Sequence, residues 1–361
     1  MTTLKAPRWS TRTTMDTVYC CWNGEMAKYF DPHLVNGPFC DPALYVDLVF
    51  EHRSLLFDLG DVSALVPRKL LRIAQVFVSH RHMDHFIGFD PLLRCLLGRE
   101  KELGVWGPEG TIEGVESKLG AYTWNLITRY ESNLTLRASE LGRDGRIKSA
   151  DFSSANGFRR KDLRDSECEN RILVADPSYK VRAAILEHGI PVLAFAVEER
   201  TRINIWRSRV EEMGLAVGPW LSTFKDAILN GEDDQLPIAI TWADERADRP
   251  AHLPLGQLRS EIMKETKGRK IGYIVDTAFT LGNARAIVAL VDHADILFIE
   301  APFLHEDIAH ATARNHLTAK QAGTLARWAN VKQLRTFHYS PRYRGCACNL
   351  ADEAQAAFLG R

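Results

Sequence analysis

The stretch FVSHRHMDHF, residues 77–86, places three histidines and one aspartate within six consecutive positions. Histidine and aspartate are common ligands of zinc and similar divalent ions, so the stretch predicts a metal site rather than a polar loop that happens to be rich in histidine. The apolar run AQVFVS, residues 74–79, predicts a buried strand that leads into it. Because sites in α/β proteins lie at the carboxyl ends of strands, this position favours ligands. The candidate ligands in the stretch are His80, His82, Asp84 and His85.

Lone polar residues follow three later apolar runs, each of which predicts a strand. They are His188 after residues 181–187, Asp276 after residues 270–275 and His338 after residues 333–337. A single polar group at a strand end can be satisfied by its local surroundings. Three such groups in successive strand units downstream of a histidine cluster favour ligands, because the cluster alone cannot complete two metal sites. The sequence therefore predicts seven metal ligands.

The composition is that of a globular protein. Hydrophobic residues make up 45% of the 361 residues and charged residues 25%, which disfavours a disordered chain. Apolar runs long enough for a membrane helix are absent from the sequence, so no membrane partner is expected. Lysine and arginine number 46, as do aspartate and glutamate, so the formal net charge is zero. Attraction to a nucleic acid must then come from a local patch of charge.

The cysteines and the N-terminal stretch favour a cytoplasmic protein with reduced thiols. The stretch MTTLKAPRWSTRTTMD lacks the apolar core of a secretory signal, and seven cysteines are an odd number. Two pairs are close in sequence, Cys20 with Cys21 and Cys346 with Cys348. Neither spacing matches a typical zinc motif, so we do not expect these cysteines to bind metal.

Short apolar runs alternate with amphipathic stretches, which predicts a layered α/β architecture. Strands are expected at residues 43–50, 54–60, 74–79, 103–107, 181–187, 191–199, 270–277, 294–302 and 333–339, and helices at residues 88–100, 108–120 and 317–329. Two polar regions interrupt this alternation. Residues 143–170 are expected to be rich in loops, and residues 200–268 to form an arm or insertion in a single domain of residues 1–361.

Five segments, in this order, resemble the five motifs of the metallo-β-lactamase superfamily. They are LLFDLG (55–60), VSHRHMDH (78–85), ILEHGIPVLAFAVEE (185–199), GRKIGYIVDT (268–277) and TFHYSPRY (336–343). The last motif resembles the ribonuclease Z-like branch, as do IEAPF (299–303) and NHLT (315–318). The resemblance extends from about residue 35 to residue 345.

The resemblance implies an αββα four-layer sandwich that holds two divalent metal ions, most commonly zinc, with manganese or iron as alternatives. It assigns His80, His82 and His188 to the first ion, Asp84, His85 and His338 to the second, and Asp276 as the bridge. Asp58 matches the aspartate that holds the second ring nitrogen of a ligand histidine.

The resemblance also implies catalytic and substrate-binding residues. Asp84 is expected to take part in catalysis, and His316 to protonate the departing oxygen while Glu300 orients it. Arg342 and Tyr343 are expected to bind substrate. Residues at the start of a helix often bond only to backbone, and surface arginines often form ion pairs, so a structural role stays open for His316 and for Arg342.

The chain departs from the ribonuclease Z pattern in three places. The segment LVNGPFCDPALYVD, residues 34–47, lacks the basic element expected there. IEAPF lacks a histidine and a threonine of its motif, and NHLT has Leu317 where the motif has serine. These departures leave the predicted fold and metal site intact but bear on the substrate.

Three functions remain open from the sequence. The first is a ribonuclease Z-like phosphodiesterase that acts on RNA, such as the 3′ end of tRNA, and is favoured by HYSPRY and by residues 200–268. The second is a small-molecule metallo-hydrolase for a cyclic nucleotide, another phosphodiester or a sulfate ester, favoured by the zero net charge. The third is a metal-binding protein without catalysis. The resemblance also suggests a homodimer.

Overall fold

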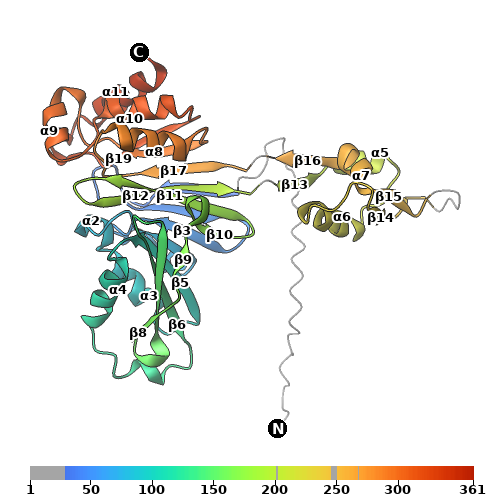
Figure 1. The fold of residues 1–361 in the computed structure, drawn as a ribbon, viewed down its shortest axis with the longest axis horizontal. Helices are drawn as coiled ribbons and strands as arrows, with labels where there is room; N and C mark the ends of the chain where they lie inside the picture. The colour runs from blue at the N-terminus through green and yellow to red at the C-terminus, as the bar shows by residue number, and fades with distance from the viewer. Residues whose placement is uncertain (1–28, 201, 245–249, 267) are drawn as a thin grey trace, which may run out of the picture.

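The structure, a computed structural model, describes residues 29–200, 202–244, 250–266 and 268–361. Two β-sheets pack face to face, and helices cover the outer face of each (Figure 1). This is the αββα arrangement predicted from the motifs. The N-terminal stretch and the Cys20–Cys21 pair lie outside the described residues.

The first sheet carries the HxHxDH segment. Within the described residues its strands are β1 (Phe30–Leu34), β2 (Leu44–Leu48), β3 (Arg53–Phe57), β4 (Ile73–Phe77), β5 (Lys101–Pro108), β6 (Leu134–Leu141), β7 (Arg146–Ser153), β8 (Arg160–Asp162) and β9 (Ser166–Glu167). Strands β2 and β3 form the predicted hairpin, with Val46 opposite Leu55. Strands β3, β4, β5 and β6 are parallel neighbours, so their carboxyl ends share one edge.

The second sheet carries the later motifs. Its described strands, in spatial order, are β10 (Ile172–Ala175), β11 (Tyr179–Glu187), β12 (Pro191–Glu199), β17 (Lys270–Ile274), β18 (Ile296–Glu300) and β19 (Leu334–Phe337). Strand β12 is antiparallel to both of its neighbours, and β17, β18 and β19 are parallel. The strands β11, β17, β18 and β19 therefore end at the same edge of the sheet.

Three apolar clusters hold the layers together. The central one is made of strand residues from both sheets, with Phe57 stacked on Phe77 at 4.9 Å between ring centroids and Phe195 from the second sheet against Phe77 at 5.6 Å. The outer clusters join each sheet to its helices. On the first sheet these helices are α1 (Pro67–Leu70), α2 (Met83–Phe86), α3 (Phe89–Leu96) and α4 (Thr111–Gly120). On the second they are α8 (Leu281–Val291), α9 (Ile308–Ala313), α10 (Ala319–Trp328) and α11 (Ala347–Leu359).

The helix boundaries follow local capping signals. Thr318 caps α10 as predicted, because its side chain accepts from the backbone N–H of Gln321 and the Gln321 side chain accepts from that of Thr318. Helix α4 begins at Thr111 rather than at Pro108, which is the last residue of β5. Single 3₁₀ turns occur at Ile127–Arg129, Ser154–Asn156, Glu169–Arg171, His305–Asp307 and Pro341–Tyr343. None of the helices in the described ranges has the length and hydrophobicity needed to cross a membrane.

Residues 143–170, expected to be rich in loops, also contain three strands that the sequence analysis did not predict. Strand β7 lies in this region and pairs with β6 over seven residue pairs, while β8 and β9 pair with β7. Its buried residues are Ile147, which packs in the central cluster, and Ala150 and Phe152, which pack in the outer cluster of the first sheet. These apolar positions do not alternate regularly and have polar or charged neighbours, so the local pattern does not indicate a strand and pairing with β6 decides the structure.

Residues 202–244 and 250–266 form a separate small unit that projects from the edge of the sandwich (Figure 1). Its elements are β13 (Arg202–Ile205), α5 (Arg207–Glu212), α6 (Trp220–Leu229), β14 (Pro237–Ala239), β15 (His252–Pro254), α7 (Leu255–Ile262) and β16 (Met263–Thr266). Trp220, Phe224 and Leu258 lie in an apolar cluster of its own. The segment leaves the second sheet after β12 and returns at β17, the strand bonded to β12.

Candidate metal centre

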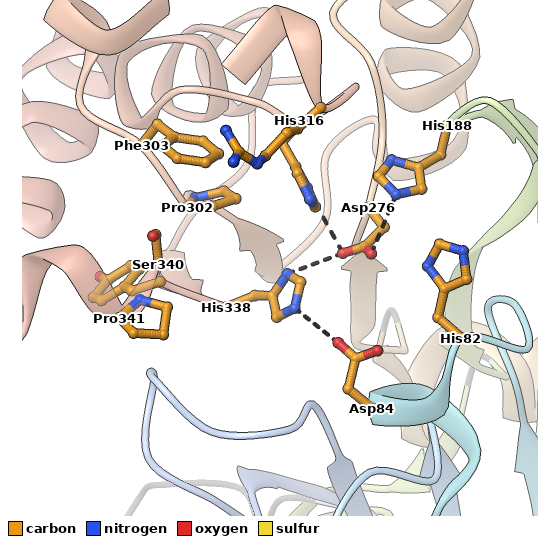
Figure 2. A pocket seen from close by; sticks show the side chains of 12 residues that line it. His82, Asp84, His188, Asp276, Pro302, Phe303, His316, His338, Ser340 and Pro341 are labelled. Atoms are coloured by element: carbon orange, nitrogen blue, oxygen red, sulfur yellow. Dashed lines mark ion pairs between the residues drawn. The ribbon is translucent and has the colours of Figure 1, made fainter. Parts of the chain in front are cut away.

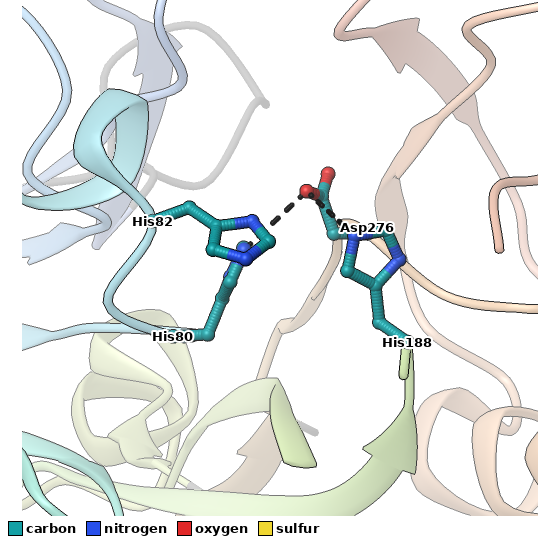
Figure 3. A group of neighbouring side chains, drawn as sticks. All are labelled: His80, His82, His188 and Asp276. Carbon is teal, nitrogen blue, oxygen red and sulfur yellow. Dashed lines mark ion pairs between the residues drawn. The ribbon is translucent and has the colours of Figure 1, made fainter. Parts of the chain in front are cut away.

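The seven predicted ligands meet at the common edge of the two sheets. Donor atoms of His80, His82, His188 and Asp276 lie within 4.8 Å of one another (Figure 3). The same holds for a second group made of Asp84, His85 and His338, of which Figure 2 shows Asp84 and His338. The residues from 80 to 85 follow β4, whereas His188, Asp276 and His338 follow β11, β17 and β19. The parallel strand ends bring together side chains that are up to 258 positions apart in the sequence (338 − 80).

In three of these histidines, the ring nitrogen that points away from the cluster contacts another protein group. His85 Nδ1 donates to Asp58 Oδ2 at 2.9 Å, and His188 Nδ1 donates to the backbone carbonyl of Asn315 at 2.8 Å. His80 Nδ1 lies 3.0 Å from Ser79 Oγ. The Nε2 atoms of His80 and His85 are buried and have no hydrogen-bond partner among the described residues. This arrangement fits a metal ion, because it fixes each ring and leaves the inward nitrogen as a free donor.

Asp276 lies at the centre of the cluster and can reach both groups. Its carboxylate is 2.9 Å from His338 Nδ1, 3.4 Å from His80 Nε2 and 3.5 Å from the Nε2 atoms of His85 and of His188. Burial raises the pKa of Asp276, but His338 and His85 outweigh this effect and hold the pKa well below its usual value. Burial, reinforced by His85, lowers the pKa of His80 to about 3. Asp276 is thus ionised and His80 neutral, the protonation states that bind a metal. Burial lowers the pKa of His85 and of His338, but carboxylates outweigh it and raise the pKa of both, so each would lose a proton on binding a metal.

Several of these residues have an uncommon backbone conformation. Asp58, Asp276 and His338 have positive φ values of 60°, 46° and 58°, in a region that residues other than glycine seldom adopt. Such strain persists where the surroundings hold it, and it is often found at functional sites. One surrounding group is Asn283 on α8, whose buried side chain bonds to the backbone of Glu187 and Ala278 and so ties together the loops that carry His188 and Asp276.

A buried hydrogen-bond network behind His85 joins the two sheets. Asp58 follows β3 and accepts from the backbone N–H of Ser79 at 2.6 Å and from Ser79 Oγ at 3.0 Å, in addition to His85. Tyr273 on β17 of the opposite sheet donates its hydroxyl to Asp58 Oδ2 at 2.8 Å and is fully buried. The motif indicated Asp58 in advance, but Ser79 and Tyr273 carry no sequence signal of this role.

Replacing Tyr273 by phenylalanine is expected to weaken metal binding by about 10- to 100-fold, the usual effect of losing an outer hydrogen bond of a metal site. The change removes one of the donors that orient Asp58, and hence His85, without opening a cavity. Metal affinity measured by competition with a chromogenic chelator tests this. Tyr179→Phe, at another buried tyrosine of the second sheet, is the matched control. Equal affinities for both variants and the unmodified protein would contradict the role assigned to Tyr273.

His316 and Glu300 form a pair next to Asp276. His316 Nδ1 donates to Glu300 Oε2 at 2.8 Å, and the Glu300 Oε1 atom accepts from the backbone N–H groups of Thr277 and Leu317 at 3.0 and 3.1 Å. Burial raises the pKa of Glu300, but His316 lowers it to about 2. Burial lowers the pKa of His316, and Glu300 outweighs this to raise it. Leu317 is fully buried in the outer core, which accounts for an apolar residue at this position.

A cavity of about 420 Å³ opens over the centre. Its lining residues are His82, Asp84, His188, Asp276, Pro302, Phe303, Arg314, His316, His338, Tyr339, Ser340 and Pro341 (Figure 2). The two predicted substrate-binding residues are not among them. Arg342 instead pairs with Asp307 at 3.3 Å, and the buried Tyr343 donates its hydroxyl to Asp307 as well. Arg314, which the motifs did not single out, supplies the one lysine or arginine side chain among these described lining residues.

Comparison with known proteins shows sequence similarity over most of the chain. A ribonuclease Z from Deinococcus radiodurans is 28% identical over 316 residues, which cover 86% of this chain and 90% of the relative. One from Synechocystis sp. is 29% identical over 80% of this chain and 74% of the relative, and one from Bacillus velezensis is 28% identical over 86% of each. No family model matches the chain.

Comparison with solved structures supports the fold. The metallo-β-lactamase fold protein YhfI from Bacillus subtilis aligns with a TM-score of 0.51 and 16% identity, covering 91% of this chain and 93% of YhfI. A likeness at this level concerns the architecture and not the activity. The chain therefore has the metallo-β-lactamase fold, and its sequence is similar to that of ribonuclease Z along most of its length.

Proposed function

We propose that this protein is a metal-dependent phosphodiesterase of the ribonuclease Z type that hydrolyses RNA, such as the 3′ end of tRNA, or a related phosphodiester. The observation that carries the proposal is the convergence of seven ligand-type side chains beside the His316–Glu300 pair in one cavity. The similarity to several proteins named ribonuclease Z supports it.

The residues that would hold metal divide into two sets around Asp276. His80, His82 and His188 would hold one ion, Asp84, His85 and His338 the other, and the carboxylate of Asp276 both. Zinc suits this donor set best, and manganese or iron could also bind. When bound, two such ions supply Lewis-acid stabilisation of a phosphoryl group and lower the pKa of water.

The chain's own residues would position the substrate and move protons. Glu300 holds His316 through Nδ1 and favours its protonated form, which can then give a proton to the departing 3′ oxygen. Asp84 is 42% exposed at its side chain, and one of its oxygens lies 3.3 Å from His85 Nε2. Its carboxylate can accept a hydrogen bond from the attacking water and so orient it.

A second candidate function is hydrolysis of a small ester, such as a cyclic nucleotide, another phosphodiester or a sulfate ester. The chain has no net charge, and Arg314 alone adds a fixed positive charge among the described lining residues. A polymeric anion normally meets a broader basic surface. A metal-binding protein without catalysis would not need the His316–Glu300 pair and is the weakest candidate.

Three other features remain predictions. We infer a single domain of residues 1–361 in which residues 200–268 form an arm, in keeping with the separate core of that segment. A cytoplasmic location is supported by the free thiols of Cys40, Cys95 and the other described cysteines. A homodimer is testable by light scattering.

The proposed function is tested by incubating the purified protein, reconstituted with zinc or manganese, with four substrates in parallel. These are a 3′-extended tRNA, a cyclic nucleotide, bis-p-nitrophenyl phosphate and p-nitrophenyl sulfate. We expect cleavage of the tRNA at its 3′ side and of the aryl phosphodiester, and loss of both activities with a chelator. Turnover of the cyclic nucleotide or sulfate without tRNA cleavage would establish the second function, and metal binding without any turnover would exclude both.

A further inference from the structure

We propose that Arg314 at the mouth of the cavity binds a phosphate of RNA next to the one that is cleaved, so that the site distinguishes a polynucleotide from a small diester. The inference rests on the proposed function. It adds Arg314 to the residues that bind substrate, and it assigns to Arg314 the phosphate next to the cleaved one. A single-phosphate ester would reach the metal ligands without using this arginine.

Arg314 is the one arginine or lysine among the described residues that line the cavity. It follows α9, lines the cavity and is exposed to solvent. Its recorded side-chain partner within the described residues is His310, whose Nε2 accepts a hydrogen bond from the Arg314 guanidinium. A guanidinium has five N–H donors in a planar fork, so one contact to a neutral histidine leaves several free for phosphate oxygens.

The surroundings of Arg314 favour an anion. Burial lowers the pKa of His310, and Arg314 and Arg342 lower it further, which means that both guanidinium groups act on the same ring. Asp307 offsets Arg342 through their ion pair at 3.3 Å, whereas the structure records no carboxylate paired with Arg314 among the described residues. Of the two guanidinium groups near His310, that of Arg314 is therefore the one whose positive charge is not offset by a paired carboxylate among the described residues.

The position of Arg314 separates it from the cleaved phosphate. Asp276 lies at the floor of the cavity and is 3% exposed, while His80 and His85 are fully buried and do not line it. His316 stands beside this floor, with its ring 4.7 Å from that of His188, and it would meet the departing oxygen there. Arg314 carries no recorded bond to His316 or to a ligand and faces solvent at the rim. A chain leaving the floor past His316 would bring its next phosphate to Arg314.

The test compares Arg314→Ala with Arg314→Lys and with two other arginine variants on two substrates. Arg342→Ala tests the arginine that the sequence analysis predicted to bind substrate. Arg335→Ala is a charge-matched control at an exposed position outside the cavity lining. On a 3′-extended RNA we expect kcat/KM of Arg314→Ala to fall by about 10- to 100-fold, mainly through KM, as for the loss of a charge-assisted bidentate bond. On bis-p-nitrophenyl phosphate it should change by less than about 2-fold. Arg314→Lys should recover part of the loss.

A second measurement separates binding from turnover. Binding of a fluorescent single-stranded oligoribonucleotide to the metal-free protein is followed across salt concentrations, and Arg314→Ala should flatten the slope of log affinity against log salt by about 0.7, the share of one phosphate contact. Equal losses on both substrates, an unchanged slope, or a loss confined to Arg342→Ala would each overturn the proposal. An unmodified protein that binds the RNA through Arg314 but hydrolyses neither substrate would refute the proposed function and leave only the contact between Arg314 and an RNA phosphate.

Discussion

If the proposed two-ion centre is right, replacing Asp276 by alanine is expected to abolish phosphodiester hydrolysis and to leave the zinc-reconstituted protein with one ion or none. The carboxylate lies within 3.5 Å of ring nitrogens from both proposed metal-holding sets, so its loss would remove a donor from each. A bound ion supplies several kcal/mol of stabilisation, and about 1.4 kcal/mol is a factor of ten, so turnover should fall by at least about 10³-fold. Elemental analysis and hydrolysis of bis-p-nitrophenyl phosphate provide the two readouts.

The Asp276 experiment needs a check on folding, because the carboxylate is buried among histidines. Circular dichroism should show an unchanged fold, and Asp276→Asn, which conserves the shape of the side chain, should lose metal and activity in the same way. Asp292→Ala, at an exposed aspartate after α8, is the matched control and should retain both. Retention of two ions and normal turnover in Asp276→Ala would disprove the bridging assignment.

Replacing His316 by alanine is expected to lower turnover by about 10²- to 10⁴-fold without changing the metal content. The reason is that Glu300 holds its Nδ1, and the side chain is 16% exposed toward the cavity, which suits a proton donor to a leaving group. The loss should be largest for an alkyl phosphodiester such as RNA. It should shrink for an ester of p-nitrophenol, because that oxygen departs without needing a proton.

The comparison of the two esters decides between roles for His316. Equal losses on the alkyl and the aryl substrate would point to phosphate binding or structural support, and loss of metal would make His316 a ligand. His293→Ala, at a histidine that is 63% exposed beside Asp292, serves as the control and should leave both rates unchanged. Glu300 is a less selective probe, since it also accepts from the backbone of Thr277 and Leu317.

The confirmed predictions concern elements whose sequence signal lies within a few neighbouring residues. The hairpin of β2 and β3 and the capped start of α10 follow from apolar period and capping chemistry within a few residues. Strand β7 was not predicted, because Ile147 packs in the central cluster and Ala150 and Phe152 pack in the outer one, on opposite faces that exist only when β6 lies beside them. A strand with weak local preference depends on its neighbour across the sheet.

The same division applies to the site. By itself the sequence determined the seven residues that meet at the sheet edge, because a polar residue directly after an apolar strand is a local feature and parallel strands end together. The tertiary structure alone decided which groups support them, such as Tyr273 behind Asp58 and the Asn315 carbonyl behind His188. It also decided that Arg314, and not Arg342, lines the cavity. These contacts join segments that are distant in the sequence. They depend on where each side chain points and how deeply it is buried, and both are set only when the two sheets and their helices have packed.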